Sequence, residues 1–254
     1  MTPLMLDLTQ LPHSSLLANI RSPYGLLRIV ENGQYRWFTL GDDHVIQGVM
    51  DKTQPDLLCA PVNQAMFISL LPITANTQLL NLGAGSGCFE RALKESAIKL
   101  TSVEISADII AAAQKYFLLD ETTPIINDCA EHFIAQCQQR FDVILIDIFS
   151  AQSQQALLQK HAFWHACFTH LTPRGKIAIN LAPSNEQQVI NLLLLLRSLF
   201  NEFIVIEFKQ FKNIVVIASN ASLAGITIEN IQLCDNINTA NLAENIKQLL
   251  YTKN

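Results

Sequence analysis

A glycine-rich loop and an acidic residue beyond it carry the clearest chemical signal in this sequence. The loop runs from Gly83 to Gly87 as G-x-G-x-G, and Glu104 lies twenty-one positions after Gly83. Glycines let a loop backbone approach a ligand closely, and a carboxylate accepts hydrogen bonds from ribose hydroxyls. An apolar run precedes the loop, a helix-like segment follows it, and a second apolar run ends at Glu104. This order predicts a strand–loop–helix–strand unit that holds the ribose part of a nucleoside cofactor.

The spacing of the glycines distinguishes two kinds of nucleoside cofactor. The dinucleotide fingerprint G-x-G-x-x-G requires glycine at position 88, where this chain has Cys88. The G-x-G-x-G form is typical of enzymes that bind S-adenosylmethionine or a relative, which has no pyrophosphate for the helix start to hold. The alternative is a tight turn without a ligand, which leaves the position of Glu104 unexplained. The residues expected to contact the cofactor here are Gly83, Ala84, Gly85, Ser86, Gly87, Glu104 and Ile105.

Two further acidic residues follow later apolar runs. Asp128 comes after residues 124–127, and Asp147 ends the run at 141–147. Open α/β sheets bind ligands outside the carboxyl ends of their strands, so acids at three successive strand ends are expected to meet at one site. Taken singly, each acid has a structural alternative. Glu104 would be a solvated strand end, Asp128 a helix cap and Asp147 part of a turn.

The elements that must position these acids alternate between strand and helix from about residue 62. Such alternation is typical of an α/β fold with a parallel sheet covered on both faces. Strands are predicted at residues 78–82, 100–104, 124–127, 141–147, 176–181, 203–208 and 214–219. The connection between the last two is too short for a parallel crossover, which needs a dozen or more residues. The sheet is therefore predicted to be mostly parallel with an antiparallel last strand, as in a class I methyltransferase-like Rossmann fold.

The N-terminal part of the chain shows a different pattern. Asn32-Gly33 is a strong hairpin signal between two strand-like segments. Strands are predicted there at residues 26–31, 35–40 and 44–48. We therefore divide the chain into a small antiparallel β unit at residues 1–60 and a nucleoside-binding α/β domain at residues 61–254. Near the C-terminus, residues 240–250 are predicted to form a helix.

Composition limits the classes of partner. Of the 254 residues 50% are hydrophobic, enough for a buried core, and the net charge of −5 argues against nucleic acid. Six cysteines without a C-x-x-C pair or metal-ligand spacing indicate reduced thiols in a cytoplasm and no metal site. The N-terminus has no basic-then-apolar segment typical of a signal peptide. The most apolar run, Leu192 to Leu196, is far shorter than the roughly 20 residues of a membrane span.

Several segments together resemble the spermidine synthase (polyamine aminopropyltransferase) family over roughly residues 22–220. The N-terminal β unit is similar to that of the family, and the glycine loop and the three acidic strand ends match its successive motifs in order. The resemblance implies that Glu104 holds the ribose. Asp128, with Cys129 beside it, would contact the adenine amino group. The cofactor would be S-adenosylmethionine or its decarboxylated form, and Asp147 would face its reacting end. The resemblance also favours a homodimer.

Two positions depart from the family pattern, and both concern the acceptor. Ser150 replaces the second aspartate of the Asp-x-x-Asp-Pro motif, and Gln47-Gly48 stands where the family has a Tyr-His pair. A polyamine is mostly ammonium at neutral pH, so its attack on a sulfonium carbon needs a carboxylate that takes a proton. The resemblance thus implies transfer of an aminopropyl or related group to an unidentified acceptor, with Asp147 as candidate catalytic residue and Gln47 and Ser150 in the acceptor pocket.

Two other functions stay open. The chain would be a methyltransferase if it uses intact S-adenosylmethionine. It would be a binding or assembly protein if it kept the fold and lost the chemistry.

Overall fold

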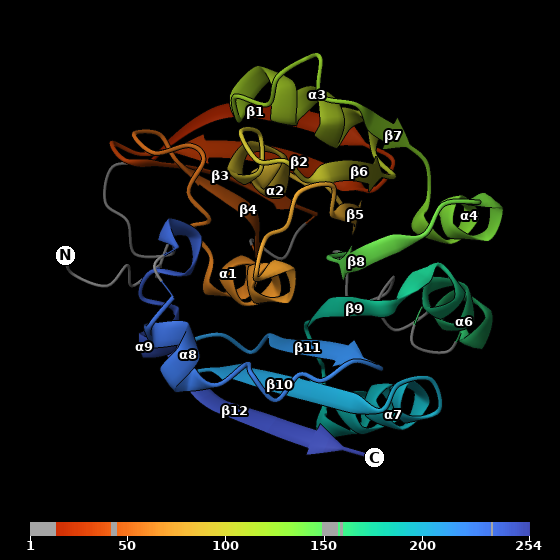
Figure 1. Cartoon of the computed structure of the whole chain (residues 1–254). Coiled ribbons are helices and arrows are strands. Elements are labelled where there is room, and N and C mark those ends of the chain that lie inside the picture. The colour runs from red at the N-terminus through yellow and green to blue at the C-terminus, as the bar shows by residue number, and fades with distance from the viewer. Residues whose placement is uncertain (1–13, 42–44, 149–156, 158–159, 235) are drawn as a thin grey trace.

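The computed structural model contains an eight-stranded sheet, a separate four-stranded sheet and the helices that connect the strands (Figure 1). The structure describes residues 14–41, 45–148, 157, 160–234 and 236–254. The order of strands in the larger sheet is β12-β10-β11-β9-β8-β5-β6-β7. Their bounds are β5 Gln78–Leu82, β6 Lys99–Glu104, β7 Ile125–Asn127, β8 Phe141–Ile146, β9 Leu171–Leu181, β10 Glu202–Phe208, β11 Ile214–Ser219 and β12 Ile246–Lys253.

The pairing of these strands confirms the predicted fold class. Five adjacent strands run parallel to one another, in the spatial order β7, β6, β5, β8 and β9. Strand β11 is antiparallel to both β9 and β10, because the short connection after β10 allows only a reversal of direction. The structure is therefore a mostly parallel α/β sheet in which two strands near one edge, β11 and β12, run in the opposite direction.

The C-terminal tail differs from its prediction. The predicted helix at residues 240–250 is wrong, since only Leu242–Asn245 is helical (α9) and β12 follows it directly. Strand β12 pairs antiparallel with β10. Without it, β10 would present a row of unpaired backbone groups at the sheet edge. Pairing with that edge, together with packing of Leu249 against the core, outweighs the helical tendency of the segment.

Helices cover both faces of the larger sheet (Figure 1). One group packs on the face that carries Leu80 and Ile144, and the other on the face that carries Leu79 and Val143, as the two-residue period of a strand requires. The first group is α4 Ala130–Gln136, α6 His161–Thr169 and α7 Glu186–Arg197. The second is α1 Pro61–Phe67, α2 Cys88–Ala92, α8 Ile228–Gln232 and α9. None of the helices in the described part of the chain combines the length and apolar character that a membrane crossing requires.

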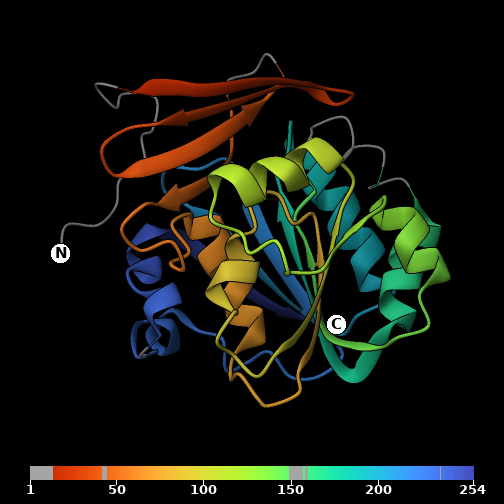
Figure 2. The same cartoon turned by 90° about the horizontal axis from the view of Figure 1, so that it is seen from above.

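The smaller sheet is antiparallel and contains the predicted hairpin. Its strands, in spatial order, are β1 Ser15–Ser22, β2 Gly25–Glu31, β3 Tyr35–Leu40 and β4 Ile46–Asp51. The turn at Asn32 joins β2 to β3, whereas β1 was not predicted. Residues 42–44, where the third strand was predicted to begin, lie outside the described residues. Leu27 and Phe38 of this sheet pack on α3 (Ala107–Tyr116), which lies below it in Figure 2.

Candidate functional site

The glycine loop joins the carboxyl end of β5 to the start of α2. Gly83, Gly85 and Gly87 have φ angles of 100°, 55° and 74°, a region that side chains disfavour. A Cβ atom on Gly83 would overlap the carbonyl oxygen of Asp147, whereas a Cβ on Gly85 would meet nothing within 4 Å. Glycine at position 83 therefore allows the loop to approach Asp147. The open space beside Gly85 leaves room for a ligand against the backbone.

This difference predicts unequal effects of alanine at the two positions. We expect Gly83→Ala to destabilise the fold by about 1–3 kcal/mol more than Gly85→Ala. Both variants place a side chain at positive φ, but only the first also forces it against the Asp147 backbone. Urea unfolding of the two variants measures the difference. Equal losses of stability would show that the overlap at Gly83 is relieved at no cost.

Glu104 ties the glycine loop to the end of β6. Its side chain is 6% exposed. One carboxylate oxygen accepts a hydrogen bond from the Gly85 backbone N–H at 3.0 Å, and the other accepts one from Ser106 N–H at 3.0 Å. Burial raises the pKa of Glu104, and these two amides oppose that increase. Each oxygen keeps a further lone pair, so ribose hydroxyls can be bound without breaking either bond.

Asp128 lies directly after β7 and is more open to solvent. Its carboxylate accepts the Cys129 backbone N–H at 2.8 Å and contacts His132 Nδ1 at 2.7 Å. The hydrogen bond with His132 is the main reason why the pKa of Asp128 is lowered. The helix-cap alternative for Asp128 is wrong, because the N-cap of α4 is Cys129, whose Sγ accepts the His132 backbone N–H.

Asp147 follows β8 and is the most deeply buried of the three acids at 4% exposure. One of its oxygens accepts a hydrogen bond from Asn180 Nδ2 at 2.6 Å, and the other accepts one from Asn63 Nδ2 at 3.1 Å. Burial raises its pKa to about 7. The two amides oppose this increase, and the negative charges of Glu104 and Glu90 add to it. A carboxyl group with this pKa can exchange a proton at neutral pH.

The two asparagines at Asp147 were not predicted as site residues. Asn180 had one signal, a polar residue inside the apolar strand β9. Asn63 lies in the first turn of α1, two positions after Pro61, and nothing in the local sequence distinguishes it from an ordinary solvated helix residue.

One cavity of about 510 Å³ connects these residues at the carboxyl ends of β5, β6 and β8. The predicted site residues that line it are Gln47, Gly83, Gly85, Glu104, Ile105, Asp128, Cys129 and Asp147. The four-stranded sheet and the turn between β1 and β2 add a largely apolar wall of Pro23, Tyr24, Phe38 and Leu40. A volume of this size falls within the range of pockets for small molecules.

Some predicted residues lie elsewhere. Ala84, Ser86 and Gly87 belong to the loop but do not line the cavity. Ala84 and Ser86 are buried, and a Cβ on Gly87 would contact Leu119, because the turns of the loop direct these positions inward. Ser150, the second acceptor-pocket residue, lies outside the described residues.

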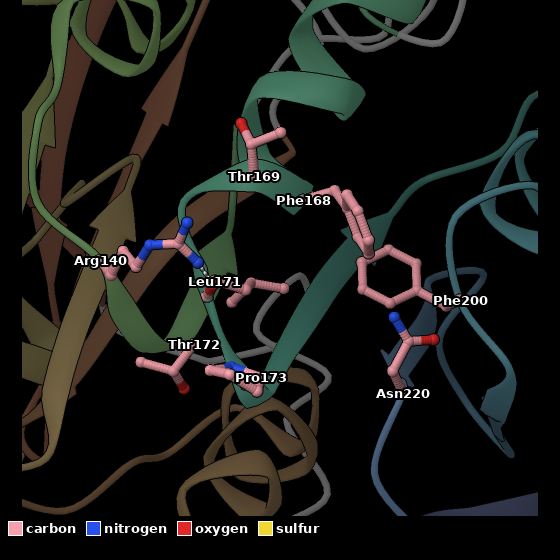
Figure 3. A pocket seen from close by; sticks show the side chains of 9 residues that line it. Arg140, Phe168, Thr169, Leu171, Thr172, Pro173, Phe200 and Asn220 are labelled. Atoms are coloured by element: carbon pink, nitrogen blue, oxygen red, sulfur yellow. Dashed lines mark hydrogen bonds between the residues drawn. The ribbon is translucent and has the colours of Figure 1, made fainter.

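A second cavity, of about 260 Å³, lies at the opposite ends of the strands, where β8 and β9 begin (Figure 3). Arg140 lines it and donates a hydrogen bond to the Leu171 carbonyl at 3.1 Å. Phe168 and Phe200 form its apolar side, with ring centroids 5.4 Å apart. Of the predicted site residues that the structure describes, none lines this second cavity.

Sequence comparison finds two curated relatives in bacteria, and no family model matches the sequence. A probable polyamine aminopropyl transferase of Bifidobacterium longum is 26% identical over 154 residues, which is 59% of this chain and 34% of the relative. A polyamine aminopropyltransferase of Chromobacterium violaceum is 28% identical over 159 residues, 61% of this chain and 60% of the relative. This chain thus matches about a third of the length of the first relative and about three fifths of the length of the second.

Structural comparison supports the same fold. A spermidine synthase in complex with the transition-state analogue AdoDATO aligns with a TM-score of 0.69 and 17% identity, covering 87% of this chain and 80% of that one. Human methyltransferase-like protein 13 in complex with SAH aligns with a TM-score of 0.59 and 17% identity, covering 72% of this chain and 90% of that one. With the two sequence matches and the order of motifs along the strands, these likenesses support a relationship to the spermidine synthase (polyamine aminopropyltransferase) family.

Proposed function

We propose that this chain is a transferase that binds S-adenosylmethionine or its decarboxylated form and transfers an aminopropyl or related group to an acceptor. One observation carries the proposal. The open glycine loop, Glu104 and a proton-exchanging Asp147 meet in a single cavity at the carboxyl ends of adjacent strands. Ligands reported for two structural neighbours, AdoDATO and SAH, support an adenosyl-type cofactor.

The residues around the cavity fit such a cofactor. Gly85 offers open space beside its backbone, and Glu104 has lone pairs left for the ribose. Asp128, at the rim, would accept the adenine amino group. The cofactor would supply a carbon made electrophilic by the attached sulfonium.

Asp147 would provide the proton-transfer step. During in-line displacement a lone pair of the acceptor forms the new bond to carbon, the bond from carbon to sulfur breaks, and sulfur keeps the electron pair as a thioether. The proton on the attacking atom passes to Asp147, whose pKa of about 7 leaves much of it ionised at neutral pH. The surrounding cavity would contribute by positioning the two reactants and by excluding water.

Titration calorimetry with the two cofactor forms tests this proposal. Tighter binding of decarboxylated S-adenosylmethionine supports aminopropyl transfer. Tighter binding of the intact form supports methyl transfer. Glu104→Gln is expected to weaken binding by about 10- to 100-fold, because hydrogen bonds to a charged group become bonds to a neutral amide. The exposed Glu95→Gln serves as control, and absence of binding of either form at millimolar concentration would refute both enzyme functions.

A further inference from the structure

Three asparagine side chains form a hydrogen-bonded network that ends on the carboxylate of Asp147. Asn63 comes from α1, Asn180 from β9, and Asn213 from the connection between β10 and β11. Asn63 and Asn180 each donate to a different oxygen of Asp147, at 3.1 Å and 2.6 Å. Asn213 Nδ2 donates to Oδ1 of Asn180 at 2.9 Å. Elements far apart in the sequence therefore converge on one carboxylate.

The hydrogen bond from Asn213 fixes the direction of the Asn180 amide. With Oδ1 of Asn180 occupied by Asn213, its Nδ2 faces Asp147. A flipped Asn180 amide would place its oxygen against the carboxylate and its NH2 group against the NH2 group of Asn213. Both contacts would be repulsive, so the network itself selects the orientation.

The charged side chains that raise the pKa of Asp147 are both negative. They are Glu104 at the end of β6 and Glu90 on α2. Asp147 forms no ion pair within the part of the chain that the structure describes. Its anion is therefore stabilised by the dipoles of neutral amides and receives no help from a neighbouring cation.

We propose that Asn63 and Asn180 are positioning residues that orient the Asp147 carboxylate toward the cavity and keep its anion accessible for proton transfer. Amide donors on both oxygens fix the plane of the carboxylate, and each oxygen keeps a lone pair for a proton from the acceptor. Neutral donors achieve this without a positive charge that would repel a sulfonium or ammonium ligand. The inference rests on the proposed function for its chemical meaning, but the arrangement of the carboxylate can be tested without any ligand.

Infrared titration of the ligand-free protein measures the protonation of Asp147 directly. The C=O band of its protonated carboxyl is identified as the band that Asp147→Asn removes. In Asn63→Leu and in Asn180→Leu the midpoint of this band should rise by about one to two pH units, because each loses one donor to the anion. Asn213→Leu should raise it less, since Asn213 acts through Asn180. Asn191→Leu, on the exposed side of α7, should leave the midpoint unchanged.

A second pair of variants of nearly the same size and shape is tested in case the leucine variants do not fold. Asn63→Asp and Asn180→Asp keep the shape of the side chain and place a second carboxyl beside Asp147, so the midpoint should again rise. Circular dichroism confirms that each variant is folded. An unchanged midpoint in the folded leucine and aspartate variants would overturn the proposed role of the two asparagines.

The titration also separates this inference from the proposed function. If the midpoint moves as expected but no acceptor is turned over, the transferase function fails and the arrangement at Asp147 stands. If turnover is found but neither the midpoint nor the acidic limb of the pH–rate profile moves in the variants, the function stands and the positioning role fails.

Discussion

Asp147→Asn is expected to lower the rate of group transfer by roughly 10²- to 10⁴-fold, the usual contribution of a general base. The substitution keeps the shape of the side chain and removes its ability to take a proton. One of the flanking amides, Asn63 or Asn180, must turn to accept from the new NH2 group, a change small enough to leave the fold intact. Initial rates with the cofactor form that calorimetry identifies measure the effect.

Asp128→Asn provides the comparison for this variant. Asp128 lies at the rim of the same cavity, so its substitution should raise KM for the cofactor and leave kcat nearly unchanged. Turnover by Asp147→Asn at the wild-type rate would remove Asp147 from the mechanism. Loss of folding, seen by circular dichroism, would assign it a structural role instead.

The stability of the protein should depend on pH through the same residue. The pKa of Asp147 is about 7 in the folded protein, against an ordinary value of 3.8 for an aspartate, so folding raises it. Protonated Asp147 therefore contributes to the free energy of unfolding. This contribution is fully present below about pH 4 and is lost as the pH rises through about 7, where the carboxyl of the folded protein ionises. A shift of about three units corresponds to roughly 4 kcal/mol.

Urea unfolding at pH 4 to 8 measures this effect as a difference between two proteins. Wild type should lose roughly 4 kcal/mol relative to Asp147→Asn across this range. The difference is needed because other carboxyls act in the opposite sense. Hydrogen bonds lower the pKa of Asp51 and of Glu31, so their contributions are lost at low pH in both proteins. Parallel stability curves for wild type and variant would contradict a raised pKa at Asp147.

The arrangement of the glycine loop and the acidic strand ends could be predicted from sequence because it depends on local pattern. An apolar strand followed by G-x-G-x-G places Gly83 and Gly85 directly after the carboxyl end of that strand. The parallel pairing of β5 with β6 and β8 brings the carboxyl ends of all three strands to the same edge of the sheet. Glu104 and Asp147 therefore lie close to the loop, because β6 and β8 both pair with β5. Side-chain orientation within the loop was beyond this reasoning. Ala84 and Ser86 were predicted to contact a ligand, and neither lines the cavity.

The remaining features depend on contacts between distant segments. Asn63 reaches Asp147 across 84 positions of the sequence and Asn180 across 33, and asparagine follows no periodicity that would signal either contact. Strand β12 depends on the free edge of β10, which exists only after the sheet has formed. Gln47 was predicted to lie in the acceptor pocket and lines the cavity, whereas Asn63 and Asn180 are the side chains that bind Asp147.

Gly48 lies where strand β4 approaches both the neighbouring strand β3 and the glycine loop. A Cβ at this position would lie 2.6 Å from the Phe38 ring and 2.8 Å from the hydroxyl oxygen of Ser86 in the glycine loop. Any larger residue at position 48 therefore requires Phe38 and Ser86 to move, and close-packed interiors resist such movement. A designed change to histidine here would need compensating substitutions in both the sheet and the loop.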